Sequence, residues 1–168
     1  MAEPFKLTRI SSLKTPQAFR EHASSLGLNL SCDDHIQPAA ESPLAKPLNR
    51  ITLGGKTPGN RIAIHPMEGW DGTTSGGVTE EMTRRWQRFG ESGAKLILGG
   101  EAMAVRPDGR ANPNQLVINN DNQAGIVSLL DTLLRAHAER YDSTDDLAIG
   151  FQLTHSGRFC RPNEKNRF

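Results

Sequence analysis

The feature that most constrains the fold is an alternation of short apolar runs and amphipathic stretches in the later part of the chain. Residues 61–66, 95–98 and 147–153 are apolar runs of strand length. Between them, residues 79–92 and 122–140 carry apolar side chains at the spacing of a helix face. The order strand, helix, strand, helix, strand is typical of a parallel sheet with right-handed crossovers. The sequence therefore predicts an α/β fold, either a (β/α)8 barrel or an open doubly wound sheet.

The outer side of the first predicted helix is charged, and Thr79 is its candidate cap. Glu80 and Glu81 each precede an arginine, Arg84 and Arg85, by four residues, a spacing that favours ion pairs. We expect these two arginines and Arg88, with their glutamate partners, to form a solvated face.

The first part of the chain has a different character. Thr15 is positioned to cap a helix with Pro16 at its first position. Residues 31–47 then hold several prolines among small and polar residues, which indicates a linker-like arm. We therefore divide the chain into an N-terminal arm with a short helix, residues 1–47, and an α/β part, residues 48–168.

A β-hairpin is predicted at the start of the α/β part. Residues 48–53 and 61–66 are short apolar runs, and residues 54–60 between them are rich in glycine. Two such runs around a glycine-rich turn are typical of a hairpin. The expected order is thus helical arm, short hairpin, and alternating strands and helices.

Composition excludes several classes of protein. The 168 residues fit about one domain. With 20 Lys and Arg against 19 Asp and Glu, the chain lacks the basic excess of a strong nonspecific nucleic-acid binder. No apolar run approaches the roughly 18 residues of a membrane helix, and residues 1–6 do not resemble a secretory signal. We expect a cytoplasmic protein with a small-molecule substrate, no nucleic-acid or membrane partner, and possible self-association into a homo-oligomer.

The cysteines and histidines do not predict a metal site. Cys32 and Cys160 lie far apart and outside any CxxC pattern, and the five histidines are scattered. We interpret the cysteines as two free thiols in a reducing compartment, with a disulfide between them as the alternative.

The segments that follow the three predicted strands are candidates for a binding site, because both folds bind ligands at the carboxyl ends of their strands. Residues 65–72, 99–105 and 152–158 combine small residues with polar ones. Small residues let a flat ring lie close to the backbone, and an amide side chain offers it both a donor and an acceptor. The chain contains no GxGxxG, GxxxxGK[ST] or GxSxG motif, which disfavours Rossmann, P-loop and serine-nucleophile sites.

Three of these runs together resemble the old yellow enzyme family of flavin-dependent NAD(P)H oxidoreductases. Residues 60–67, NRIAIHPM, resemble the first barrel strand of that family. Residues 101–110, EAMAVRPDGR, resemble its second strand end and the loop that follows. Residues 152–158, QLTHSGR, match the third strand end, a Q-L-x-H-x-G-R pattern. The three matches occur in the right order, and the resemblance covers roughly residues 48–160.

The resemblance implies a partial TIM (β/α)8 barrel, made of the first three βα units, that binds FMN at its mouth. Hydride would pass from NADH or NADPH through the flavin to an activated alkene or similar acceptor. The implied cofactor-binding positions are Pro66, Met67, Glu68, Gly100, Ala102 and Gln152, and His155 is a substrate-site candidate. The amide of Gln152 would hydrogen-bond the pyrimidine edge of the flavin, which alternates donors and acceptors.

Two acidic residues near this site need separate interpretation. Glu68 stands where the family usually has Thr or Cys, and a carboxylate there disfavours an anionic reduced flavin. We hypothesise that Glu68 either lowers the flavin potential or joins a local hydrogen-bond network. We expect Glu101 to pair with Arg106 or Arg110.

The family's substrate-anion pair, its late phosphate-binding loops and its proton donor have no counterpart in these residues, so the catalytic residues are unknown. We therefore expect a fragment that retains FMN weakly or not at all and has no turnover alone. The alternative is a non-catalytic α/β fragment that oligomerises or complements a separately encoded remainder.

Overall fold

The computed structural model describes residues 7–164 and divides the chain into two compact units. The first unit, residues 1–41, contains helix α1, Pro16–Ser25. The hydroxyl of Thr15 accepts a hydrogen bond from the Ala18 N–H at 3.1 Å, so the predicted cap is confirmed. The second unit begins at Ser42, whereas composition places the boundary after residue 47. No helix within residues 7–164 is long and apolar enough to cross a membrane.

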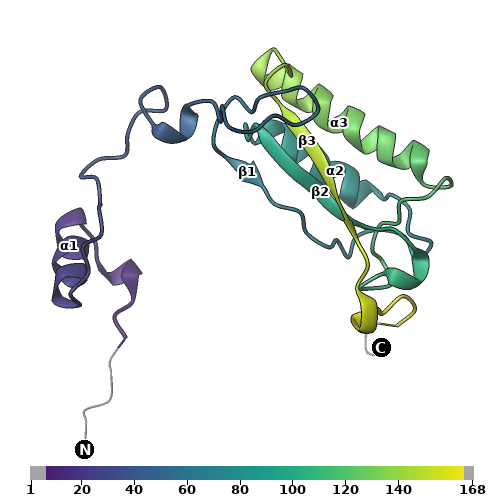
Figure 1. Ribbon diagram of the computed structural model, residues 1–168, viewed down its shortest axis with the longest axis horizontal. Helices are drawn as coiled ribbons and strands as arrows, with labels where there is room; N and C mark the ends of the chain where they lie inside the picture. The colour runs from purple at the N-terminus through teal and green to yellow at the C-terminus, as the bar shows by residue number, and fades with distance from the viewer. Residues whose placement is uncertain (1–6, 165–168) are drawn as a thin grey trace, which may run out of the picture. The chain divides into compact units, whose positions relative to one another are not determined.

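The second unit is built on a three-stranded parallel sheet with the order β1-β2-β3. The strands are β1, Ala63–Ile64, β2, Leu96–Ala104, and β3, Ala148–Thr154. Helix α2, Glu80–Glu91, connects the first two strands, and helix α3, Gln123–Tyr141, connects the last two. Both helices lie on the same side of the sheet (Figure 1). The predicted α/β alternation is confirmed.

The predicted hairpin is wrong. Strand β1 pairs in parallel with β2 and not with residues 48–53. Leu53 instead forms an isolated antiparallel bridge with Lys56, with N–H···O distances of 3.0 and 3.1 Å. Gly54 and Gly55 both adopt positive φ, 58° and 76°, so the chain reverses within two residues. The turn closes on itself, and the second apolar run joins the parallel sheet.

The core lies between the sheet and its two helices. Its buried members are Met82, Trp86, Ile97, Met103, Leu116, Ile126, Leu129, Leu133 and Leu147. Thr79 caps α2 as predicted, because its hydroxyl accepts the Met82 N–H at 3.3 Å. Each large apolar side chain buried here contributes roughly 1.5–3 kcal/mol to folding. This packing covers one face of the sheet and leaves the other face for the pocket described below.

Strand β2 is longer than predicted and contains a bulge. The sequence suggested a strand over residues 95–98 followed by a loop, but β2 continues to Ala104. Leu98 lies opposite Gly150 of β3, whereas Ala102 lies opposite the residue two positions further on, Gln152. Gly99 accommodates this shift with a φ of 58°. A Cβ at Gly99 would lie 2.6 Å from the backbone nitrogen of Gln152, so the bulge requires glycine there.

The amino end of the sheet is fixed by a buried polar contact. The His137 ring is fully buried, and its Nδ1 lies 2.9 Å from the carbonyl oxygen of Gly90. Its Nε2 lies 2.8 Å from Nζ of Lys95, which also donates to the Asp146 carboxylate at 2.6 Å. A lysine ammonium only donates, so Nε2 accepts and Nδ1 carries the proton. Burial lowers the pKa of His137 below its usual value, and the charge of Lys95 lowers it as well.

We predict that Gly99→Ala destabilises the protein more than Gly157→Ala. Both glycines have similar positive φ values, 58° and 56°, so both substitutions carry the backbone cost of about 1–2 kcal/mol. A Cβ at Gly157 meets no atom within 4 Å, whereas one at Gly99 meets backbone. Urea unfolding should therefore show an additional loss of roughly 1–3 kcal/mol for Gly99→Ala. Equal losses for the two variants would contradict the role assigned to the bulge.

We also predict that acid destabilises the protein through His137. The unfolded imidazole takes up a proton near pH 6.5, whereas the folded one, with its lowered pKa, does so only at lower pH. The unfolded state therefore binds more protons in this window, and stability falls as the pH decreases through it. The free energy of unfolding, measured at pH 7.5 and 5.5, should depend less on pH in His137→Gln. His35→Gln, at an exposed position, should keep the wild-type dependence; an unchanged dependence in His137→Gln would refute the assignment.

Candidate functional site

The open face of the sheet carries a pocket that lies just beyond the end of β1 and beside the middle of β2 and β3. Pro66 follows β1, Gly99 lies in β2, and Gln152 lies in β3; all three line a pocket of about 330 Å³. Gly150 and Leu53 line it as well. The structure thus brings together two of the predicted cofactor positions, Pro66 and Gln152. The residue of β2 that joins them is Gly99, which the sequence interpretation passed over for Gly100.

Three other predicted positions, Met67, Glu68 and Gly100, line a second pocket of about 380 Å³ beside α2. Gly100 faces the helix, because a Cβ there would lie 3.2 Å from the Trp86 ring. Glu68 is exposed and makes none of the hydrogen bonds found within residues 7–164. The exposed Trp70 contributes an aromatic ring to the same pocket.

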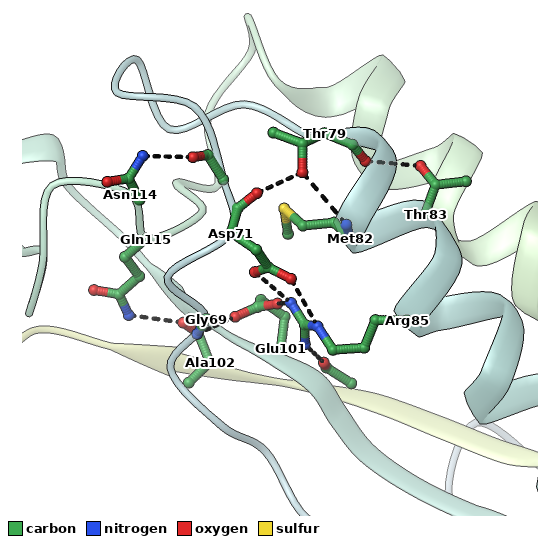
Figure 2. Close-up of polar contacts among 12 residues, drawn as sticks. Gly69, Asp71, Thr79, Met82, Thr83, Arg85, Glu101, Ala102, Asn114 and Gln115 are labelled. Carbon is green, nitrogen blue, oxygen red and sulfur yellow. Dashed lines mark hydrogen bonds and ion pairs between the residues drawn. The ribbon is translucent and has the colours of Figure 1, made fainter.

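Ala102 lines neither pocket, and its side chain is buried. Its N–H donates to the carbonyl oxygen of Met67 at 3.1 Å. Its own carbonyl accepts from the buried amide of Gln115 at 2.7 Å (Figure 2). Ala102 therefore holds the loop that follows β1 against β2.

His155 follows β3 directly and is exposed. Its ring packs on Gly109, where an added Cβ would lie 2.5 Å from the ring carbon Cδ2. Its Nδ1 accepts the Gly157 N–H at 3.0 Å, so a neutral ring carries its proton on Nε2. His155 lines neither of the two pockets described above.

An ion-pair cluster of Arg85, Asp71 and the buried Glu101 lies at the second pocket (Figure 2). Arg85 of α2 donates to both carboxylate oxygens of Asp71, at 3.0 and 2.8 Å, and to Glu101 at 2.6 Å. The other oxygen of Glu101 accepts the Gly69 N–H at 2.8 Å. Glu101 has no exposed side-chain surface. The cluster joins the loop after β1, helix α2 and strand β2.

Two expectations about these charges are wrong. Glu101 pairs with Arg85 and not with Arg106 or Arg110. Arg85 is accordingly not part of a solvated face and is not held by Glu81. The physical reason is the bulge in β2, which places a carboxylate beside α2 where regular helix spacing could not reveal it. Burial raises the pKa of Glu101, while the hydrogen bond and charge of Arg85 oppose that rise. Burial alone would lower the pKa of Arg85, but its bonds to the two carboxylates raise it.

The loop after β2 provides a polar framework that the sequence interpretation missed. Asn112 is fully buried and donates to the carbonyl oxygen of Gly69 at 3.0 Å. The side-chain amide of Asn114 donates to the carbonyl oxygen of Gly72 at 2.7 Å, and the Gly72 N–H donates to the carbonyl oxygen of Asn114 at 2.9 Å. The only sequence signal for these contacts is the density of amide side chains in this loop. Among residues 7–164, no group of three or more His, Cys, Asp or Glu is arranged to hold a metal ion.

The fold and the pocket define a parallel α/β protein whose candidate ligand site lies on the open face of the sheet, beyond the end of β1. No protein-family profile and no curated protein sequence matches the chain. Solved structures do match it. The old yellow enzyme from Trypanosoma cruzi is 25% identical with a TM-score of 0.51, over 70% of this chain and 28% of that one.

Two further structures have similar folds. Morphinone reductase in complex with tetrahydroNAD is 23% identical with a TM-score of 0.53, over 71% of this chain and 29% of that one. A 2-naphthoyl-CoA reductase complex is 18% identical with a TM-score of 0.58, over 71% of this chain and 16% of that one. The chain thus spans less than a third of each of these proteins. The resemblance to old yellow enzymes that the three motifs predict is confirmed at the level of the fold.

We predict that Arg85→Met destabilises the protein by about 3–5 kcal/mol, because it leaves the buried Glu101 without its cation. Arg88→Met, on the exposed side of the same helix, should change stability by less than about 0.5 kcal/mol. Adding Glu101→Gln to Arg85→Met should recover part of the loss, since the buried charge is then removed. Urea unfolding of the four proteins, wild type included, measures these differences. Similar losses for the two arginine variants would show that the cluster is not the main support of this region.

Proposed function

We propose that residues 42–164 are the flavin-binding first three βα units of a TIM barrel in an old yellow enzyme-like oxidoreductase. The observation that carries this proposal is the placement of Pro66, Gly99 and Gln152 around one pocket on the open face of a parallel sheet. The similarity to the Trypanosoma cruzi old yellow enzyme supports the same assignment.

The residues of this pocket suit a flat ring system. Gly99 and Gly150 present no side chain, and Pro66 presents only a compact ring, so a planar ligand could approach the backbone beside Leu53, whose side chain packs on Gly150. Gln152 supplies an exposed amide with a donor and an acceptor, the pair needed to recognise the alternating edge of an isoalloxazine. When bound, FMN would supply hydride transfer between a nicotinamide and an acceptor. The tetrahydroNAD in the morphinone reductase structure supports NADH or NADPH as the donor.

The other predicted positions take supporting roles in this proposal. Met67 and Glu68 follow Pro66 in the chain and extend the site toward the second pocket. The exposed carboxylate of Glu68 would disfavour negative charge nearby and so lower the potential of a bound flavin. Gly100 and Ala102 hold the backbone of β2 against α2 and the loop after β1. His155 remains our candidate for substrate contact, and the acceptor would be an activated alkene or similar molecule.

A second candidate function is favoured by the edge of the sheet. Within residues 7–164, β3 pairs only with β2, and its Leu153 and Phe151 side chains are 60% and 38% exposed. An open edge with apolar side chains is a surface for pairing with another chain. The alternative is therefore a non-catalytic α/β protein that associates with itself or with a complementary chain.

We predict that the protein binds FMN weakly and reversibly, and that Gln152→Leu weakens this binding about tenfold. The reason is the loss of an amide hydrogen bond worth on the order of 1.4 kcal/mol. Quenching of FMN fluorescence during titration measures the dissociation constant. Gln123→Leu, an amide substitution at an exposed position of α3, is the matched control and should bind like wild type.

No saturable binding at millimolar FMN would contradict the proposed function. If sedimentation of the same sample then showed stable oligomers, the second candidate function would be favoured. If wild type and Gln152→Leu bind FMN equally well, the proposal that the protein binds flavin stands, but the role assigned to Gln152 is wrong.

A further inference from the structure

Arg110 is a buried cation whose hydrogen bonds go to backbone carbonyls. Its side chain lies in the loop after β2, and the residue is only 7% exposed. The acceptors are the carbonyl oxygens of Pro107 at 3.0 Å, Thr74 at 2.8 Å, Pro113 at 2.7 Å and Pro162 at 2.9 Å. Burying a guanidinium is costly unless its donors are satisfied, and four carbonyls satisfy most of them here.

These four carbonyls come from all three loops at the carboxyl edge of the sheet. Thr74 belongs to the loop after β1, Pro107 and Pro113 to the loop after β2, and Pro162 to the loop after β3. A guanidinium is a rigid planar fork, so its acceptors must keep fixed directions relative to one another. One side chain therefore hydrogen-bonds to all three loops.

Backbone hydrogen bonds join the same loops in pairs. The Ser156 N–H donates to Gly109 at 2.9 Å, and the Arg161 N–H donates to the carbonyl of Arg110 at 2.8 Å. The ring of His155 packs on Gly109. The loop after β1 is held separately, through Gly72 and Asn114. Arg110 connects both sets of contacts.

We propose that Arg110 is a positioning residue that keeps the loops after β1 and β3 in register around the ligand site. The segment after β1 carries Met67 and Glu68, and the segment after β3 carries His155. This inference rests on the proposed function, since the ligand in question is FMN. Arg110 touches neither pocket and acts through the backbone that it holds.

The test compares wild type with Arg110→Met, Arg110→Lys and the control Arg106→Met. Arg106 lies in the same loop, but its side chain is 68% exposed and pairs only with Asp108 among the residues described. Amide hydrogen exchange is followed without FMN, and the FMN dissociation constant is measured by fluorescence quenching.

In Arg110→Met we expect amides of residues 72–76 and 156–161 to exchange at least tenfold faster, with α2 and α3 still protected. The FMN dissociation constant should rise about tenfold in this variant, and Arg110→Lys, which keeps the charge and three donors, should recover part of both effects. Arg106→Met should resemble wild type in both measurements.

Faster exchange confined to residues 106–113 would overturn the proposal. Unchanged FMN affinity in a variant whose two distant loops both exchange faster would overturn it as well. If wild type itself does not bind FMN, the proposed function fails instead, and the exchange data still decide whether Arg110 links the loops.

A variant that unfolds would lose hydrogen-exchange protection in α3. In that case, an experiment on wild type alone decides whether Arg110 links the loops. Exchange of wild-type amides is measured at increasing denaturant below the unfolding transition. If Arg110 links the loops, the amides of residues 72–76 and 156–161 open together with one denaturant dependence. Separate opening of the two segments would contradict the proposal.

Discussion

The bulge at Gly99 is the constraint on which the rest of the second unit depends. Gly99 adopts a positive φ, and β2 shifts register by two residues relative to β3. Consecutive residues of β2 therefore contact different parts of the molecule. Gly99 lines the open-face pocket, Gly100 packs on α2, and Glu101 is buried against Arg85. A single irregularity thus connects the pocket, the helix layer and the ion-pair cluster.

The two ends of the sheet are stabilised by different chemistry. At the amino end, His137, Lys95 and Asp146 form a compact contact between α3 and the segments that precede β2 and β3. At the carboxyl end, the buried side chains of Arg110 and Asn112 donate hydrogen bonds to backbone carbonyls of the long loops and so hold these loops in place. Side-chain-to-backbone bonds of this kind let irregular segments be ordered without an apolar core of their own. This is the end at which parallel α/β proteins bind their ligands.

Much of the fold could be predicted because it is encoded locally. The caps Thr15 and Thr79, the apolar faces of α2 and α3 and the order of strands all follow from spacing along the chain. The hairpin prediction was wrong because Gly54 and Gly55 close a tighter turn than the apolar runs suggested.

The candidate site was only partly predictable, since its contacts join distant residues. Pro66 and Gln152 were found through motifs, and the structure places them in one pocket. Gly99 was missed because a bulge changes which residue of a strand faces a given side. The partners of Arg85 and Arg110 were also missed, because no spacing rule connects Asp71 with Arg85 or Arg110 with Pro162.

The most direct test of the central claim, that a flat ligand lies on the open face between β1, β2 and β3, is an NMR titration of the isotope-labelled protein with FMN. Binding at this face should shift the side-chain amide of Gln152 and the backbone amides of Gly99 and Gly150, while the amide of Gly90, which lies in α2 and is buried against α3, stays unchanged. Shifts confined to the second pocket around Trp70 and Phe89, or no shifts at all, would contradict the account.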